Sequence, residues 1–310
     1  MRAAGLWQMA QSSLMAGLLL ALFAPSAGAV LVYQRPSTRA IVAARNDGSH
    51  AQVIAHGSSP VVSPDGRKVA FVVPHGSDDH HLRLVSIHGG PSRRLTADVF
   101  VVDRSAPFVW SPNSRYVAVC SVSNGVFIID VPHHKRRFVF LGEQCGLASF
   151  APDSSGVLVE GINESSVDLN FVPVTRGETR DFHGSNPAWG KRGFAFNADS
   201  GDLLLRKRVG APARLLHRAS SGYAYGRAWS ADGNTLLALG GTPTDGLQAL
   251  LIARKSAQTT IFPQRFSALE SISRNGKVVL GEQGGNVVAA KPDGSTRVLA
   301  LQATSPSWTR

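Results

Sequence analysis

The sequence predicts an all-β fold, a seven-bladed β-propeller closed by a blade shared between the N- and C-termini. The first observation is a bulky apolar anchor that recurs at steps of 48, 40, 39, 40, 43 and 36 residues, the period range of propeller blades. The second is the turn residues that follow several anchors, and the third is the absence of helical periodicity between them. The anchors are Val62, Trp110, Phe150, Trp189, Trp229, Ile272 and Trp308.

The first complete unit shows the expected order of elements. Residues 60–62 form a short apolar strand, and Asp65-Gly66 then reverses the chain. Asp tolerates and Gly permits the positive φ that such tight turns require. The unit continues with a second strand at 68–73, a polar loop at 75–81, a third strand at 82–87, a turn at Gly89-Gly90 and a fourth strand at 92–96.

Later units repeat this order with drift. Second and third strands are expected at 116–119 and 126–130, at 236–239 and 249–252, and at 277–280 and 286–289. In the unit at Trp189, Gly190 to Gly193 shortens the first turn. Short, evenly spaced strands separated by turn residues are typical of a closed all-β array.

The two ends of the chain are expected to form one blade together. Residues 305–308 read as a first strand with no blade after it, whereas residues 30–33, 39–44 and 50–55 supply only three strands. Together they make one four-stranded blade. Such closure removes the exposed strand edges that would otherwise pair with other chains.

Residues 1–29 read as a secretory signal peptide, which leaves 30–310 as the propeller. Arg2 provides the positive start, residues 14–23 an apolar run and Ala27-Gly28-Ala29 a small-residue cleavage pattern. The apolar run is shorter than a membrane-spanning helix requires. We therefore expect a periplasmic or secreted protein. In an oxidising compartment Cys120 and Cys145 can form a disulfide, and two buried free thiols are the alternative.

The formal net charge of +11 raises the question of a nucleic-acid partner. The basic clusters lie in separate repeats and lack interleaved aromatic residues for stacking bases, so we expect no nucleic-acid binding. They are Arg93-Arg94, Lys135-Arg136-Arg137, Lys191-Arg192 and Arg206-Lys207-Arg208. A basic envelope protein can instead lie near anionic lipid heads or acidic polymers, with only peripheral membrane contact.

The repeats resemble the TolB-type propeller repeat, a relative of the WD repeat found mainly in bacterial envelope proteins. The match is Pro-x-Trp-Ser-Pro-Asp/Asn-Gly/Ser before an apolar strand, clearest at residues 60–71 and 107–119 and weaker at 226–239. The resemblance implies a WD40-like propeller fold and an envelope location. Between the signal and the first blade there is no room for the α/β domain that precedes the propeller of TolB itself. A repeat of this kind serves many unrelated functions.

The sequence shows no recognisable arrangement of catalytic acid and base residues. The Gly-x-Ser-x-Gly elbow of α/β-hydrolases is absent. Propeller lyases and lactonases place His and carboxylates at the channel mouth, and the densest such set here is His75, Asp78 and His80, a candidate metal site because imidazole and carboxylate suit Zn, Ni or Mn. A solvated polar loop is the alternative.

A cationic, aromatic rim is the candidate ligand site. Arg227 stands where other units have Pro60, Pro107 or Pro187, close to the expected channel mouth. An acidic sugar or a peptide carboxylate would suit such a rim, and hydrogen bonding between blades is the simpler interpretation of Arg227. The candidate ligand-binding residues are Arg104, Tyr223, Tyr225, Arg227 and His183.

We therefore expect an exported, non-enzymatic, monomeric propeller without a cofactor. It would recognise an envelope or secreted protein, or an acidic polymer, through its loop face. The alternative is a propeller enzyme of the lyase or lactonase type that acts on an acidic saccharide at the channel mouth.

Overall fold

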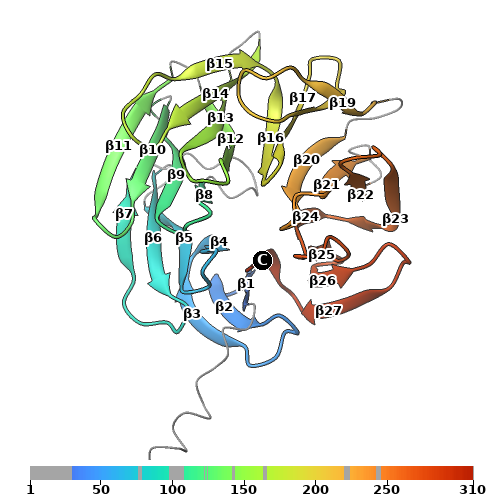
Figure 1. The fold of residues 1–310 in the computed structure, drawn as a ribbon. Coiled ribbons are helices and arrows are strands. Elements are labelled where there is room, and N and C mark those ends of the chain that lie inside the picture. The colour runs from blue at the N-terminus through green and yellow to red at the C-terminus, as the bar shows by residue number, and fades with distance from the viewer. Residues whose placement is uncertain are drawn as a thin grey trace, which may run out of the picture.

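The computed structural model describes residues 30–75, 79–97, 108–121, 123, 125–141, 144–162, 166–219, 224–241 and 246–309. The expected signal peptide, residues 1–29, lies outside them. Seven four-stranded antiparallel sheets form a ring, so the predicted seven-bladed propeller is confirmed (Figure 1). Within the described part of the chain, no helix is long and apolar enough to cross a membrane.

Each blade runs from an inner strand, beside the central axis, to an outer strand. Blade 1 consists of β28 (Thr304–Trp308), β1 (Val30–Arg35), β2 (Ala40–Arg45) and β3 (Gln52–His56). Blade 2 consists of β4 (Ser58–Val62), β5 (Lys68–His75), β6 (Asp79–Ser86) and β7 (Arg93–Thr96). Blade 3 consists of β8 (Phe108–Trp110), β9 (Tyr116–Ser121), β10 (Gly125–Asp130) and β11 (Lys135–Phe140).

The remaining blades follow the same order. Blade 4 consists of β12 (Gln144–Phe150), β13 (Gly156–Ile162), β14 (Val167–Pro173) and β15 (Arg180–His183). Blade 5 consists of β16 (Ser185–Gly190), β17 (Gly193–Asn197), β18 (Leu203–Arg206) and β19 (Arg214–His217). Blade 6 consists of β20 (Tyr225–Trp229), β21 (Thr235–Gly240), β22 (Leu247–Ala253) and β23 (Thr259–Phe266). Blade 7 consists of β24 (Ala268–Ile272), β25 (Val279–Gln283), β26 (Asn286–Ala290) and β27 (Thr296–Ala300).

The polar loop expected at 75–81 is shorter in the structure. Strand β5 continues to His75 and β6 begins at Asp79, and their pairing register runs to His75↔Asp79. Backbone hydrogen bonds between antiparallel strands form whatever the polarity of the side chains, so this polar stretch extends the hairpin. The expectation of a long loop here was wrong.

In four blades, the turns between inner and second strands share one local structure. In blade 2 the Ser63 hydroxyl donates to Asp65 Oδ1 at 2.6 Å and accepts the N–H of Lys68 at 3.0 Å, while Gly66 adopts φ 72°. Ser111 with Asn113, Ser230 with Asp232 and Ser273 with Asn275 repeat the pattern. Short polar side chains thus satisfy the turn backbone, which explains the recurring Ser-x-Asp/Asn sequence.

These turns, with those between third and outer strands, form one face of the ring, here named the hairpin face. The opposite face carries the connections from second to third strands and from blade to blade, and is named the loop face. Neighbouring turns of the hairpin face are bonded to one another, as where the N–H of Asp65 donates to Ser114 Oγ at 2.9 Å. The ends of β28 and β1 meet on this face, since the N–H of Thr309 donates to the Val30 carbonyl at 3.0 Å.

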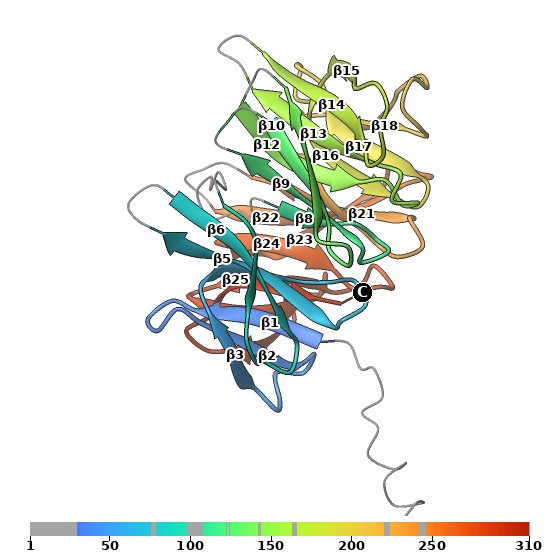
Figure 2. The same ribbon diagram turned by 90° about the vertical axis from the view of Figure 1, so that its left-hand side faces the viewer.

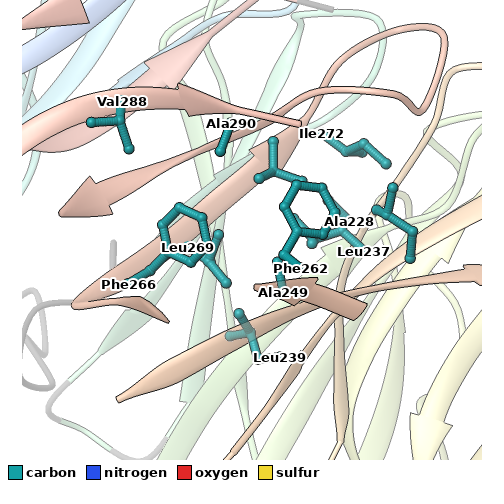
Figure 3. Close-up of a cluster of buried hydrophobic side chains, with 12 residues drawn as sticks. Ala228, Leu237, Leu239, Ala249, Phe262, Phe266, Leu269, Ile272, Val288 and Ala290 are labelled. Carbon is teal, nitrogen blue, oxygen red and sulfur yellow. The ribbon is translucent and has the colours of Figure 1, made fainter. Parts of the chain in front are cut away.

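The core lies between neighbouring blades. Figure 3 shows the cluster between blades 6 and 7, where Phe262 and Phe266 of β23 pack beside Leu269 of β24 and all three are buried. Two anchor tryptophans also bond across blades: Trp110 Nε1 donates to the Val61 carbonyl at 3.2 Å and Trp229 Nε1 to the Ala188 carbonyl at 2.8 Å. These two tryptophans therefore hold their own blades against the preceding ones.

Blades 3 and 4 are also joined covalently. Cys120 on β9 and Cys145 on β12 form a disulfide with their Cα atoms 5.4 Å apart. Both residues are buried in the cluster between these two blades. Of the two alternatives left by the sequence, the structure thus contains the cross-link.

Candidate functional site

A cavity of about 470 Å³ occupies the centre of the ring and is lined by residues of all seven inner strands. Much of its wall is apolar, with contributions from Phe108, Trp110, Trp189 and Trp308. Clefts with apolar walls and a few convergent polar groups are the usual form of a ligand site. This central channel is therefore the candidate site.

One position of the inner strand differs in chemical character between the blades. Counting two residues back from each anchor gives Pro60, Phe108, Ala148, Pro187, Arg227, Glu270 and Pro306. In blade 3 this residue is Phe108, because the Pro107 named from the sequence stands one position earlier. Five blades thus place a non-polar residue there, and blades 6 and 7 place opposite charges side by side.

The two charges form an ion pair between blades. Arg227 Nη2 lies 2.6 Å from Glu270 Oε2, and the two side chains are 24% and 20% exposed. Both residues stand at β-bulges, between Gly226 and Ala228 in β20 and between Leu269 and Ser271 in β24. A bulge leaves its extra residue outside the ladder and redirects its side chain, which explains how both reach the channel.

The ion pair holds Arg227 charged. The negative charge of Glu270 raises the pKa of Arg227 above its ordinary value and outweighs the effect of desolvation. Arg227 therefore makes the bond between blades that was the simpler interpretation of this residue from the sequence. The same count back from the anchor Ile272 would have identified Glu270 from the sequence.

Two buried donors that line the channel have no hydrogen-bond partner among the described residues: Ser271 Oγ and Trp308 Nε1. The serine and the tryptophan at the same positions of other blades do form hydrogen bonds. The N–H of Trp189 donates to Ser149 Oγ at 2.7 Å, and Trp229 Nε1 donates to the carbonyl of Ala188. Both recurring bonds are missing at the junction of blades 7 and 1. Buried polar groups normally have hydrogen-bond partners. Two buried donors without partners beside a cavity therefore indicate a position where acceptor atoms of a ligand can bind.

The other predicted ligand residues are dispersed. Arg104 and Tyr223 lie outside the described residues. Tyr225 on β20 is half-buried and packs against the core cluster between blades 6 and 7, away from a free rim. His183 ends the outer strand β15, where its side chain is 82% exposed and its Nδ1 lies 2.7 Å from Asp168 Oδ1. Of the three members of this set that the structure describes, only Arg227 lines the channel.

The predicted metal set is only partly described. Asp78 and the side chain of His75 lie outside the described residues, and His80 is half-buried on β6. Among the residues whose placement is described, no three His, Cys, Asp or Glu side chains gather in a metal-binding group. The channel contacts found here instead involve Arg, Glu, Ser and Trp.

The fold and channel define a seven-bladed β-propeller whose ring is closed by one strand from the C-terminus and three from the N-terminus. No protein-family model matches the sequence, and no curated protein matches it. Solved structures match by shape. TolB from Acinetobacter baumannii has a TM-score of 0.58 at 14% identity, over 99% of this chain and 74% of TolB.

Two enzymes are similar to the same degree. An oligogalacturonate lyase in complex with manganese matches with a TM-score of 0.60 at 14% identity, over 87% of this chain and 83% of the lyase. A putative 6-phosphogluconolactonase from Bacteroides fragilis matches with a TM-score of 0.62 at 11% identity, over 93% and 99%. At such identities the likeness is one of fold, and the fold expected from the TolB-type repeat is the one observed.

Proposed function

We propose that this protein is an exported binding propeller that holds an extended polypeptide segment of an envelope or secreted partner in its central channel. The observation that carries the proposal is the pair of unpartnered donors, Ser271 Oγ and Trp308 Nε1, beside the Arg227–Glu270 ion pair. Carbonyl groups of an extended chain are acceptors that suit such donors.

The channel wall supports a polypeptide occupant. Its proline, phenylalanine and tryptophan side chains offer an apolar surface to the partner's side chains, while the ion pair offers one charge of each sign. Aromatic residues contribute large contact areas at protein interfaces. The partner enters from the loop face, where connections between blades provide further contacts around the channel mouth.

Affinity capture from cross-linked cell envelopes, read by mass spectrometry, tests the proposal. The double variant Ser271→Ala, Trp308→Phe removes both donors and keeps most of the packing. Because a hydrogen bond contributes about 0.5–1.5 kcal/mol, recovery of the specific partner should fall by roughly tenfold. Arg180→Ala, an exposed position at the hairpin-face start of the outer strand β15, is the control and should capture as the native protein does.

Equal recovery by the donor variant and the native protein would overturn the channel as the binding site. A capture without any enriched protein, combined with turnover of an acidic saccharide by the native chain, would favour the lyase or lactonase alternative.

A further inference from the structure

The fold gathers basic residues that are far apart in the sequence. Because strands alternate in direction, the turn after an inner strand and the turn after a third strand lie on the same face of every blade. Lys191-Arg192 in blade 5, Arg254-Lys255 in blade 6, and Arg274 and Lys277 in blade 7 all occupy such turns. We name these six residues the basic patch.

Contacts around one turn show that the basic patch is continuous. At its centre is the blade 6 turn at residues 230–234. Arg192 Nε donates to the carbonyl of Asp232 at 2.9 Å, and the N–H of Arg254 donates to the carbonyl of Asn234 at 2.8 Å. The N–H of Ala231 donates to the carbonyl of Arg274 at 3.2 Å. Residues of three blades thus surround a single turn.

The patch holds more cations than acids. Asp232 is the acid at its centre. The Ser230 hydroxyl, with Asn234, binds its carboxylate and lowers its pKa to about 2, so at neutral pH one negative charge lies among the six cations. The described turns of the loop face hold far fewer cations, with Arg39 and Arg218 as examples. The charge is therefore concentrated on one side of the ring.

A hollow next to the patch adds donors of the right kind. A cavity of about 450 Å³ between blades 6 and 7 is lined by Lys277 and Lys291, with the hydroxyls of Thr235 and Thr260 and the carboxylate of Asp293. Ammonium and hydroxyl groups are the usual ligands of phosphate oxygens.

The start of the propeller lies on the same face. Strand β1 begins at Val30, which bonds to Thr309 at the hairpin face, and Figure 2 shows β1 and the C-terminal end on the same side of the ring. The chain therefore enters the propeller on the face that carries the basic patch.

We propose that the basic patch docks the propeller on an anionic phospholipid bilayer, hairpin face inward. Five of the six residues of the patch are exposed. Exposed lysines and arginines on turn tips match a surface of phosphate headgroups, and each such cation adds to the attraction of an anionic membrane. The central channel then stays open on the loop face.

Vesicle co-sedimentation of the full chain tests this. The vesicles are phosphatidylcholine alone, or phosphatidylcholine with phosphatidylglycerol. Lys191, Lys255 and Lys277 are exposed, and the test variant changes all three to Glu. Binding to the anionic vesicles should fall by at least roughly 100-fold, and that of the native chain should weaken as salt rises.

The matched control changes Arg35, Arg39 and Arg218 to Glu. All three are exposed on the loop face, so the net charge changes equally. This control should bind within about threefold of the native chain, because its substitutions lie away from the membrane. Residues 1–29 are common to every variant, so their own affinity for lipid cancels.

An equal loss in both triple variants would show that net charge alone drives binding and would overturn the proposal. Equal binding to vesicles with and without phosphatidylglycerol would also overturn the proposal. So would a chain that does not bind vesicles but binds polygalacturonate through the same three lysines.

Discussion

Glu282 Oε1 accepts a hydrogen bond from the backbone N–H of Ser305 at 2.6 Å, and this contact joins blade 7 to the strand that closes the ring. Ser305 precedes a proline and adopts φ 50°. The same contact occurs between blades 4 and 5. There the Glu160 carboxylate accepts a hydrogen bond from the backbone N–H of Asn186, which precedes Pro187 and adopts φ 51°. An acceptor on a second strand thus holds the unusual backbone of the following inner strand.

The first prediction follows from that contact. Glu282→Ala leaves the Ser305 N–H without its acceptor and should lower the free energy of unfolding by about 1–3 kcal/mol. Glu282→Gln keeps an oxygen acceptor and should cost clearly less, since Gln34 accepts from Ser59 at the equivalent place in blade 1. Urea unfolding of the two variants measures the difference, and equal losses would contradict the assignment.

Removal of the closing strand should destabilise the whole ring. Without residues 305–310, β1 loses its neighbour β28 and the cluster around Leu31, Tyr33 and Leu280 loses its cover. The Tm should fall by more than about 10 °C. A chain that lacks Arg310 alone is the control, and an unchanged melt of the longer deletion would refute the closure argument.

The anchor Trp229 should be costly to truncate. Its side chain is 2% exposed, it donates to the carbonyl of Ala188, and its indole fills the space that a Cβ at Gly190 would occupy. Trp229→Ala should therefore destabilise by about 3–5 kcal/mol in denaturant unfolding. Trp229→Phe retains much of the packing, so a loss as large as that of Ala would argue against the packing explanation.

The disulfide between Cys120 and Cys145 should stabilise the folded state by about 3–4 kcal/mol, because it closes a loop of 25 residues. A reductant should lower the Tm of the native chain and leave that of the Cys120→Ala, Cys145→Ala variant unchanged. Thermal melts with and without reductant make the comparison. A native chain indifferent to full reduction would contradict it.

Acid should remove the stabilisation that Asp130 provides. The Arg115 guanidinium, with help from His133, lowers the pKa of Asp130 from 3.8 to about 2. Because the folded pKa lies below the unfolded one, this stabilisation is complete above about pH 4 and is lost as pH falls through about 2. Asp130→Asn should flatten the dependence of unfolding free energy on pH between 4 and 2.

Arg115→Ala removes the main cause of that shift and should flatten the same part of the curve. Unfolding in denaturant at pH 5, 3 and 2 provides the data. If Asp130→Asn retained the native slope, the carboxyl would have no such linkage.

The architecture was accessible from the sequence because its signals are local. A blade's anchor, its Ser-x-Asp/Asn turn and its apolar strands lie within one repeat, so a fixed period reports a repeated unit. The split blade followed by counting strands at each end. The prediction of the site was limited because these signals are local. Arg227 was identified as the unusual residue of its repeat, but its partner Glu270 is 43 residues away on the next blade.

What the sequence alone determined is thus the repeat, the number of blades and the closure. Only the tertiary structure decided which groups meet: Arg227 with Glu270, and basic residues from three blades on one face. It also showed that Ser271 Oγ and Trp308 Nε1 have no hydrogen-bond partner among the described residues. The physical reason is that β-bulges and contacts between blades set where these side chains point. The contacts between blades join residues about 40 positions apart, and no pattern within a single repeat encodes which of them meet.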